Sequence, residues 1–379
     1  MKIYLIAGEA SGDLHASNLI KSLKRIYPDA EFRGWGGDMM QKAGMELVKH
    51  YRDTAVMGLI NVILKLRSIG RNIQACRKDI ENWKPDLMIF VDYPGFNLRI
   101  ASYTKAAGIP NYYYIAPKVW ASREKRVEKI KAYIDKIFAI LPFEEKYFSK
   151  HGITVDYVGS PVVDALDNRT CKNESRASFI KRSGLQDKPM VALLAGSRHH
   201  EVTQILPFFI RIAEKYPQYQ YVVAGVSVLD RSVYEHLLDG KDIKLVFDET
   251  YALLQHAEAA MVASGTATLE TALLNVPQVV CYRLWGNNIT QFVMNRIVKV
   301  PWVSLVNLIM EKEVVKELIQ KKLTDEALQK EFENLMQQPA YRNKMLEEYH
   351  ILHRIIGGPG ASDKAAERIS ATFEVSLKG

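Results

Sequence analysis

The stretch IYLIAGEASGDLH, Ile3–His15, decides the fold, because it joins a short apolar run to a turn of small residues and then to a helical pattern. A buried run that ends in such a turn and opens a helix is typical of a βα unit. The turn also bears on function, since free backbone N–H groups at a helix start bind anions. Only Gly8 and Gly12 fall in the turn, so the dinucleotide fingerprint GxGxxG is missing and we expect no nicotinamide cofactor.

Further apolar runs, rich in β-branched or aromatic residues, alternate with amphipathic segments along the chain. They are DLMIFVD, NYYYIAP, KIFAIL, PMVALLAGS, QYVVAG, AAMVASG and PQVVCYR. Strands that alternate with helices of about ten to fifteen residues form parallel sheets with helices on both faces. The sequence therefore predicts an α/β protein with doubly wound parallel sheets.

The length of 379 residues favours two domains of roughly 150 to 200 residues each. The polar, strand-poor stretch from Val158 to Ser178 separates the two series of strands and is the expected linker, with a boundary near residue 165. From Val314 onward the pattern is helical only. The expected ranges are 1–165, 166–345 and a helical segment, 346–379.

Composition limits the class of protein. The chain has 48% hydrophobic and 25% charged residues, as soluble globular proteins have. Its three cysteines, Cys76, Cys171 and Cys281, lack CxxC spacing, so we expect no disulfide framework, no zinc site and a reducing cytoplasm. We expect neither a signal peptide nor a membrane span. The net charge of +8 predicts an anionic partner: nucleic acid, a nucleotide or an anionic lipid surface.

Ligands bind beyond the carboxyl ends of the strands in open parallel sheets, and two strand ends in the N-terminal half carry polar residues. GEASGD offers backbone donors to a ligand, or is an ordinary turn in which Ser11 or Asp13 caps the helix. In FVDYPGFN, Asp92 ends a buried run, where catalytic bases are found. The alternative is that Asp92 caps the next helix, a role that Asn97 could also fill.

A third strand end, in LLAGSRHHEV, predicts a diphosphate site. Gly196 and Ser197 let a ligand approach the backbone at a helix start, and Arg198 offers a fork of donors that matches phosphate oxygens. The alternative is a Ser cap with a solvated Arg. His199 and His200 are adjacent and do not share a helix face, so we expect surface histidines and no metal site.

The fourth strand end, in VASGTATLETALL, predicts a ribose site. Gly265 and Thr266 form the turn, and Glu270 lies about one helical turn further on. A carboxylate there accepts two hydrogen bonds from a ribose diol. The alternative is a capping box from Thr266 to Glu270, which is one residue longer than the ideal spacing.

Motifs in a fixed order across nearly the whole chain resemble those of the lipid-A-disaccharide synthases, inverting glycosyltransferases of the GT-B fold. They are GEASGD, AVMG, PKVWASREKRVEKI, LPFE, GSRHHEV, ASGTATLE and VSLVNLI. The resemblance implies two Rossmann-like doubly wound domains that face an interdomain cleft, with the acceptor bound by the N-terminal domain and the nucleotide by the C-terminal domain. It also implies that the last helix crosses back to the first domain.

The resemblance further implies a reaction. 2,3-Diacylglucosamine is transferred from UDP-2,3-diacylglucosamine to 2,3-diacylglucosamine 1-phosphate (lipid X), which gives the β-1,6-linked lipid A disaccharide 1-phosphate and UDP. The reaction takes place on the cytoplasmic side of a Gram-negative inner membrane, without a cofactor or metal ion. A homodimer is left open.

On this basis the expected catalytic residues are Asp92, Ser11 and Glu9. Asp92 is preferred as general base, because its strand is the more continuously buried one, and partial desolvation is expected to raise its proton affinity. The division of work between Asp92 and Glu9 stays open. This chain departs from the family in having Tyr93 and Gly95 around the proline. The expected substrate-binding residues are Gly196, Ser197, Arg198, Gly265, Thr266, Glu270, Asn307 and Asn97.

Two other functions fit parts of the sequence. A peptidoglycan-lipid glycosyltransferase or a UDP-sugar epimerase of the same fold would share the nucleotide motifs. A nucleic-acid-binding protein would need aromatic residues interleaved with a basic patch on a recognisable module. The sequence has no such module, so we expect no nucleic-acid partner.

The stretch AVMGLINVILKLRSIGR, residues 55–71, has more apolar side chains than one buried helix face needs, so it is either a core helix or a helix in a lipid interface. The basic run 118–131 contains Trp120 and would attract anionic headgroups or the acceptor phosphate. Because both implied substrates are lipids, we expect peripheral association with inner-membrane phospholipids. The expected membrane or acyl contacts are Val56, Met57, Leu59, Ile60, Val62, Ile63 and Leu66.

Overall fold

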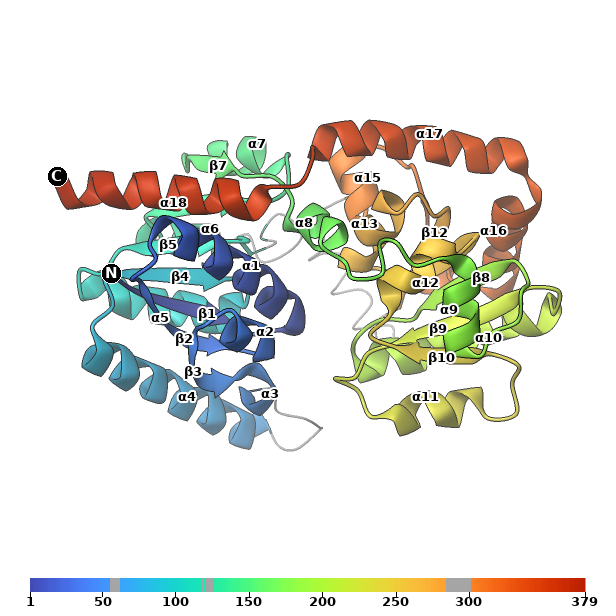
Figure 1. Ribbon diagram of the computed structural model, residues 1–379, viewed down its shortest axis with the longest axis horizontal. Helices are drawn as coiled ribbons and strands as arrows, with labels where there is room; N and C mark the ends of the chain where they lie inside the picture. The colour runs from blue at the N-terminus through green and yellow to red at the C-terminus, as the bar shows by residue number, and fades with distance from the viewer. Residues whose placement is uncertain (55–61, 118, 120–125, 284–300, 379) are drawn as a thin grey trace. The chain divides into compact units, whose positions relative to one another are not determined.

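The computed structural model describes residues 1–54, 62–117, 119, 126–283 and 301–378 (Figure 1). The chain divides into two compact units. The first unit consists of Met1–Ala165 and Gly357–Gly379, and the second of Leu166–Ile356. Each unit contains its own parallel sheet with helices on both faces.

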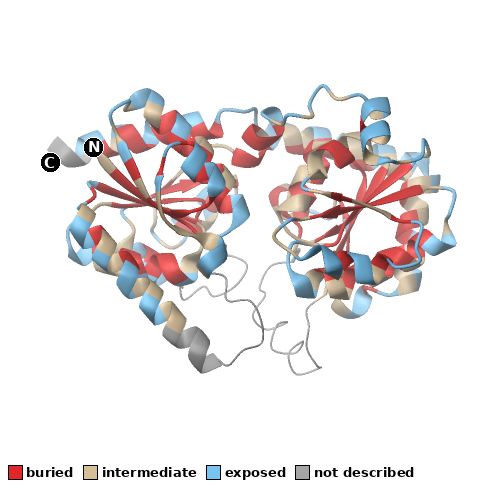
Figure 2. Cartoon of the chain, turned by 60° about the horizontal axis from the view of Figure 1, so that its bottom comes forward, coloured by how far each residue is buried: buried red, intermediate tan, exposed pale blue. Residues whose placement is uncertain are grey.

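The described residues of the first unit form a seven-stranded parallel sheet in the order β3-β2-β1-β4-β5-β6-β7. The strands are β1 (Lys2–Ala7), β2 (Glu31–Gly36), β3 (Glu46–His50), β4 (Leu87–Val91), β5 (Asn111–Tyr114), β6 (Lys136–Ala139) and β7 (Val155–Tyr157). Every residue of β4 is buried, as helices on both faces of a parallel sheet require (Figure 2).

The helices of this unit cover the sheet in two layers. They are α1 (Ala10–Ile26), α2 (Asp38–Lys42), α3 (Tyr51–Thr54), α4 (Val62–Trp83), α5 (Pro94–Ala106), α6 (Arg126–Tyr133), α7 (Glu144–Ser149), α8 (Pro161–Asp167, which runs into the second unit) and α18 (Ala361–Lys378). Apolar side chains of α1 and α18 pack on one face, and those of α4, α5, α6 and α7 pack on the other.

The described residues of the second unit form a six-stranded parallel sheet in the order β10-β9-β8-β11-β12-β13. Its strands are β8 (Met190–Leu194), β9 (Gln220–Gly225), β10 (Lys244–Phe247), β11 (Ala259–Ala263), β12 (Gln278–Tyr282) and β13 (Lys316–Ile319). Its helices are α9 (Arg176–Ser183), α10 (His199–Lys215), α11 (Arg231–Leu238), α12 (Thr250–His256), α13 (Thr266–Leu273), α15 (Leu305–Met310), α16 (Asp325–Gln337) and α17 (Pro339–Ile356), with a 3-10 turn, η1, at Gln320–Lys322.

The predicted α/β class with two doubly wound parallel sheets is confirmed, and all eight predicted strands are present as β1, β4, β5, β6, β8, β9, β11 and β12. One prediction is wrong. The segment after Val314 is not helical only, because Lys316–Ile319 forms the edge strand β13. The expected linker, all of which the structure describes, contains α8 and the start of α9 and no strand. The units divide after Ala165 and after Ile356, the latter at the end of α17.

The start of the C-terminal helix is held on the first unit by hydrogen bonds to carboxylates. Asp164 of α8 accepts hydrogen bonds from the backbone N–H groups of Gly360 (2.7 Å), Ala361 (3.1 Å) and Ser362 (2.7 Å). These donors have no partner inside α18, so the carboxylate caps it. A second carboxylate, that of Asp363, accepts a hydrogen bond from Ser22 of α1 at 2.6 Å.

His15 is buried in α1 near this cap, with 7% of its surface exposed. Burial lowers the pKa of His15 to about 4, although the charge of Asp164 opposes the shift. Between about pH 6.5 and pH 4, His15 is therefore protonated in the unfolded chain and neutral in the folded chain. In this range the free energy of unfolding falls as the pH falls.

We expect the His15→Gln variant to lose less thermal stability than the parent between pH 7 and pH 4.5, because its side chain does not titrate. A fully expressed shift corresponds to about 3 kcal/mol. The measurement is the melting temperature against pH by circular dichroism. The matched control is His236→Gln on the exposed side of α11, which should keep the parent's pH dependence. Equal pH dependence in the His15→Gln variant and the parent would contradict this assignment.

Candidate active site

In each sheet there is one pair of neighbouring strands at which the direction of the strand order reverses. The four sequence motifs lie at these two reversal points. The reversal lies between β1 and β4 in the first sheet and between β8 and β11 in the second. Helices that follow two such strands leave on opposite faces of the sheet, which opens a crevice at the carboxyl ends of the strands. GEASGD and FVDYPGFN follow β1 and β4, whereas GSRHHEV and ASGTATLE follow β8 and β11. Each unit therefore brings two of the four motifs together.

The strand register sets which residues meet in the first unit. Ala7 of β1 is paired with Val91 of β4, so Gly8 and Asp92 are the next residues on neighbouring strands. Parallel neighbours are about 4.8 Å apart. The candidate base consequently lies beside the turn that opens α1.

Gly8 is required because an aromatic ring covers it. A Cβ at this position would lie 2.3 Å from Cγ of Tyr93, and the Tyr93 ring also packs on Phe96 with 5.4 Å between centroids. Glu9 and Ser11, both exposed, follow Gly8 at the start of α1. Glu9 is the N-cap residue, and no described side chain caps this helix. The alternative in which Ser11 or Asp13 caps its own helix is therefore wrong.

Asp92 is held in an uncommon backbone conformation. Asp92 has φ 44° and Tyr93 has φ 48°, both in the left-handed region that non-glycine residues rarely adopt. The carbonyl oxygen of Asp92 accepts hydrogen bonds from Nδ2 of Asn97 at 2.7 Å and from the Tyr113 hydroxyl. Surrounding bonds of this kind are needed to keep strained residues in place. The half-buried Asp92 side chain is thus presented from a fixed position at the end of β4.

Asn97 has a structural role that sequence reasoning missed. It is fully buried, and besides Asp92 its Nδ2 lies 3.4 Å from the carbonyl oxygens of Ile6 and Val91. The amide therefore ties together the ends of β1 and β4. Because Asn97 is fully buried and its Nδ2 faces these backbone oxygens, the structure does not favour the predicted contact with substrate.

Two other polar residues of α1 also have structural roles. The Asp13 carboxylate accepts hydrogen bonds from the backbone N–H groups of Gly37 (2.8 Å), Met39 (3.1 Å) and Met40 (3.0 Å). It therefore caps α2, a helix distant in sequence, rather than its own. His15 is buried, and the nearby charge of Asp164 raises its pKa less than burial lowers it. The resulting low pKa keeps His15 neutral at physiological pH.

The turn after β8 contains a carboxylate that the sequence interpretation overlooked. Gly196 has φ 109°, which favours glycine, and Arg198 is the N-cap residue of α10. Oε2 of Glu201 accepts hydrogen bonds from the backbone N–H groups of Ser197 (3.0 Å) and Arg198 (3.2 Å). The alternative of a Ser cap is wrong, because Arg198 and not Ser197 is the N-cap residue. The Arg198 side chain is 57% exposed, as that alternative expected, and it also contacts Glu201 at 3.3 Å.

The turn after β11 differs from the turn after β8, because no described side chain occupies the space beside its glycine. Gly265 is the N-cap residue of α13, no described side chain caps that helix, and a Cβ on Gly265 would meet nothing within 4 Å. The space on the Cβ side of Gly265, at the start of α13, is therefore open. This is the arrangement that binds phosphate at a helix N-terminus.

Glu270 of α13 is positioned by a tyrosine that the sequence did not single out. The hydroxyl of Tyr251 in α12 donates a hydrogen bond to Oε1 of Glu270 at 2.8 Å. Burial raises the pKa of Glu270, and this bond opposes the rise. Glu270 thus does not cap α13, and the capping-box alternative is wrong.

Asn307 is the second amide whose predicted ligand contact the structure opposes. Its Nδ2 donates to the carbonyl of Val315 and to Glu317, both at 2.9 Å, and its Oδ1 accepts from the backbone of Val314 and Val315 at 2.7 and 3.0 Å. A side-chain amide has two donors and two acceptor positions, so this one is saturated. Asn307 shapes the segment before β13 and has no bond left for a nucleotide.

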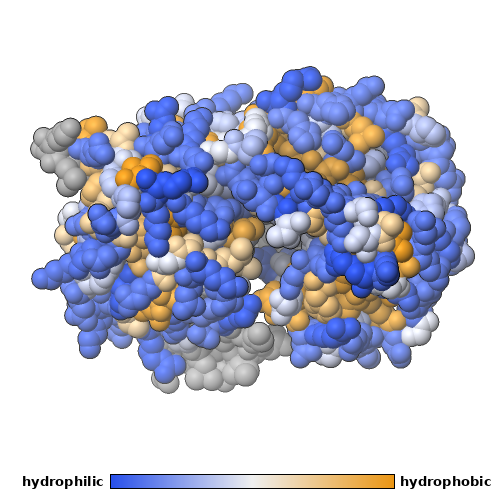
Figure 3. Space-filling model, in the orientation of Figure 1, coloured by the Kyte–Doolittle hydropathy of each residue, from blue (hydrophilic) through white to orange (hydrophobic). Residues whose placement is uncertain are grey.

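Other sequence predictions fall outside what is described. Val56, Met57, Leu59 and Ile60 lie outside the described residues, as does Trp120, and only the backbone is described for Val62, Ile63 and Leu66. Among the described residues no group of His, Cys, Asp and Glu is arranged to hold a metal ion. No described helix combines the length and apolar character needed to cross a membrane. Hydrophilic and apolar residues are interspersed on the face seen in Figure 3.

Comparison with known proteins identifies relatives over nearly the whole length. The family described as lipid-A-disaccharide synthetase matches residues 3–364. The lipid-A-disaccharide synthase of Syntrophus aciditrophicus is 36% identical over 371 residues, which are 96% of each chain. That of Myxococcus xanthus is 36% identical over 375 residues, which are 97% of this chain and 96% of the relative.

Solved structures share the fold at low sequence identity. A putative UDP-N-acetylglucosamine 2-epimerase from Listeria monocytogenes has a TM-score of 0.69 at 14% identity, over 99% of this chain and 96% of that one. The UDP-GlcNAc 2-epimerase of Methanocaldococcus jannaschii, in complex with UDP-GlcNAc and UDP, has a TM-score of 0.68 at 14% identity, over 98% and 100%. Likeness at this identity is evidence for the fold alone.

Proposed function

This chain belongs to the lipid-A-disaccharide synthetase family, and from that premise we propose how its two units divide the reaction between them. The chain is a glycosyltransferase of lipid A biosynthesis. The reaction transfers 2,3-diacylglucosamine from its UDP donor to 2,3-diacylglucosamine 1-phosphate and releases UDP. Membership in the family decides against the epimerase and the peptidoglycan-lipid enzyme, whose nucleotide motifs would look alike.

The second unit binds the UDP moiety of the donor. The observation that carries this assignment is the pair of turns at the reversal between β8 and β11, where Leu194 is paired with Val262. The uncapped start of α13 at Gly265 and Thr266 receives the diphosphate, and Arg198 reaches it from the neighbouring turn of Gly196 and Ser197.

Glu270 binds the ribose. Its carboxylate lies one turn into α13 and is oriented by Tyr251. The carboxylate oxygens can accept hydrogen bonds from the two ribose hydroxyls. Since burial already disfavours the charged form of Glu270, two hydrogen bonds from a diol would compensate for lost hydration.

The first unit binds the acceptor, and Asp92 acts as general base. In an inverting transfer the acceptor's 6-hydroxyl attacks the anomeric carbon on the face opposite the departing UDP. The O6–C1 bond forms as the bond from C1 to the phosphate oxygen breaks, and the hydroxyl proton passes to Asp92. Glu9 and Ser11, exposed in the adjacent turn, orient the acceptor sugar.

Negative charge develops on UDP as it leaves. The backbone N–H groups at the start of α13 and the guanidinium of Arg198 stabilise this charge, which builds up in the transition state. Contacts of this kind lower the barrier because they strengthen as the reaction proceeds.

The enzyme meets its lipid substrates at the inner membrane as a peripheral protein. The apolar stretch 55–71 supplies the acyl or membrane contact, and the basic run 118–131 attracts anionic headgroups or the acceptor phosphate. Both assignments are supported by sequence, since most of these side chains lie outside the described residues.

The reaction itself is tested by incubating the protein with UDP-2,3-diacylglucosamine and 2,3-diacylglucosamine 1-phosphate in a membrane-mimetic detergent. We expect mass spectrometry to detect the disaccharide 1-phosphate, with one UDP released for each bond formed. Absence of the disaccharide from a folded preparation would refute the proposed function.

Arg198→Ala should lower turnover on the order of a hundredfold or more at saturating donor, because it removes a group that stabilises charge in the transition state. The readout is the initial rate of disaccharide formation. Arg231→Ala is the matched control, since Arg231 is an exposed arginine of the same unit, paired with Glu235 of its own helix. Normal turnover by Arg198→Ala at saturating donor would show that Arg198 does not contact the leaving group.

Asp92→Asn should lower turnover by roughly two to four orders of magnitude, the usual contribution of a general base, and leave UDP affinity nearly unchanged. The amide keeps the shape of the side chain and removes the proton acceptor. Turnover is measured beside UDP binding by calorimetry. If Asp92→Asn stays within a few-fold of the parent while Glu9→Gln abolishes turnover, the two acids exchange roles.

A further inference from the structure

The phosphate-binding turn after β8 is occupied by the protein's own carboxylate. Oε2 of Glu201 accepts hydrogen bonds from the N–H groups of Ser197 and Arg198, at 3.0 and 3.2 Å, and Oε1 accepts one from Nη1 of Arg198 at 3.3 Å. A Cβ on Gly196 would lie 2.5 Å from Oε2, so this oxygen fills the space that the glycine leaves open. The Glu201 side chain is only 13% exposed.

The neighbouring turn shows that such filling is not a general property of this site. The start of α13 follows the adjacent strand; its N-cap, Gly265, has no side chain that could cap the helix, and the space that a Cβ would fill there is open. Of two helix starts at one strand reversal, one therefore holds a carboxylate of the protein and the other begins at a glycine beside open space. A carboxylate near a helix N-terminus is favoured by the partial positive charge there.

A diphosphate at the start of α13 and the Glu201 carboxylate compete for the guanidinium of Arg198, which Glu201 holds through Nη1 at 3.3 Å. Two negative charges at contact distance also repel each other. Contact of Arg198 with the diphosphate therefore weakens its bond to Glu201.

We propose that Glu201 is an internal competitor for the donor diphosphate, which holds the turn and Arg198 in the unliganded enzyme and is displaced when the UDP moiety binds. This inference rests on the proposed function. The consequence is that the site selects ligands that carry a diphosphate. A ligand without phosphate forms no new bonds to Arg198 that would compensate for displacing the Glu201 carboxylate. Glu201 is thus a positioning and specificity residue, which acts through Arg198 and the turn.

An ordinary helix cap would show the same hydrogen bonds, and ligand binding distinguishes the two roles. A residue that only caps α10 stabilises the fold, so its replacement should weaken uridine and UDP alike. A competitor for the diphosphate affects UDP alone. The Glu201→Gln variant keeps one acceptor oxygen for the turn and removes the negative charge.

We expect Glu201→Gln to bind UDP about tenfold more tightly than the parent and to bind uridine unchanged. UDP affinity is measured by calorimetry and uridine affinity by ligand-observed NMR, with thermal denaturation to verify the fold. Glu201→Ala should change UDP affinity in the same direction if removing the cap leaves the fold intact. Glu214→Gln is the matched control on the same helix, where it removes an exposed carboxylate paired with Lys241, and should leave both affinities unchanged.

The outcomes separate this inference from the proposed function. If Arg198→Ala does not weaken UDP binding relative to the parent, the nucleotide site itself is misplaced. If Arg198→Ala weakens UDP binding while folded Glu201→Gln binds UDP equally or more weakly, Glu201 is only a helix cap. Equal changes for uridine and UDP would overturn the inference in the same way.

Discussion

The parallel pairing of β1 with β4, and of β8 with β11, is the constraint on which both candidate sites depend. Side chains alternate between the two faces of a strand, so a shift of one residue in either pairing would exchange the side chains that pack against the helices on the two faces. The buried, apolar strands resist that shift on both faces. This register sets which chemistry-bearing turns are neighbours, and bonds such as that of Asn97 to the Asp92 carbonyl hold them in place.

The strained backbone at Asp92 and Tyr93 costs free energy of folding, and hydrogen bonds from buried residues hold it in place. Two successive residues in the left-handed region cost on the order of 1–3 kcal/mol each. Asn97 and Tyr113, both fully buried, bind the Asp92 carbonyl, and burial raises the pKa of Tyr113 well above its usual value. The tyrosine therefore stays protonated and keeps donating. A catalytic carboxylate that is aimed by buried donors needs little reorganisation when substrate arrives.

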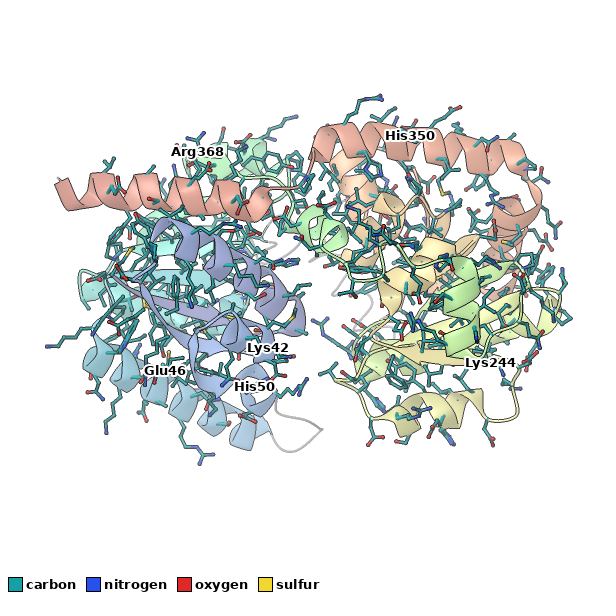
Figure 4. The ribbon with its side chains drawn as sticks, in the orientation of Figure 1. Lys42, Glu46, His50, Lys244, His350 and Arg368 are labelled. Carbon is teal, nitrogen blue, oxygen red and sulfur yellow. The ribbon has the colours of Figure 1, made fainter. Side chains whose placement is uncertain are left out.

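The sequence predicted eight strands and missed the four edge strands together with β2, an interior strand whose sequence, EFRGWG, contains two glycines and two charged residues instead of a continuous apolar run. Central strands such as β4 and β8 are apolar throughout because helices cover both faces. The missed edge strands β3, β7, β10 and β13 are three to five residues long and only partly buried. Figure 4 labels two polar residues of β3, Glu46 and His50, and the exposed Glu46 puts a charge on an edge that would otherwise invite pairing.

The same limit applies to the site. Which turns meet was foreseeable, because strand ends of a doubly wound sheet converge. The sequence did not show which polar side chains remain available to a ligand, because this depends on partners distant in sequence. Asp13 caps α2, Asn307 bonds to the segment before β13 and to Glu317, and Tyr251 orients Glu270. Glu201 was missed as well, because the recognisable capping pattern begins with Ser or Thr, and the N-cap residue three positions before Glu201 is Arg198.

The attachment of α18 to the first unit has a consequence for synthesis on the ribosome. Residues Ala365, Ala366, Ile369 and Phe373 belong to the same core as α1, yet they are translated after the whole second unit. Until then the apolar face of α1 lacks its cover and Asp164 lacks the helix start that it caps. The nascent first unit thus remains incomplete while the second unit emerges, and exposed apolar surface of that kind is what chaperones bind.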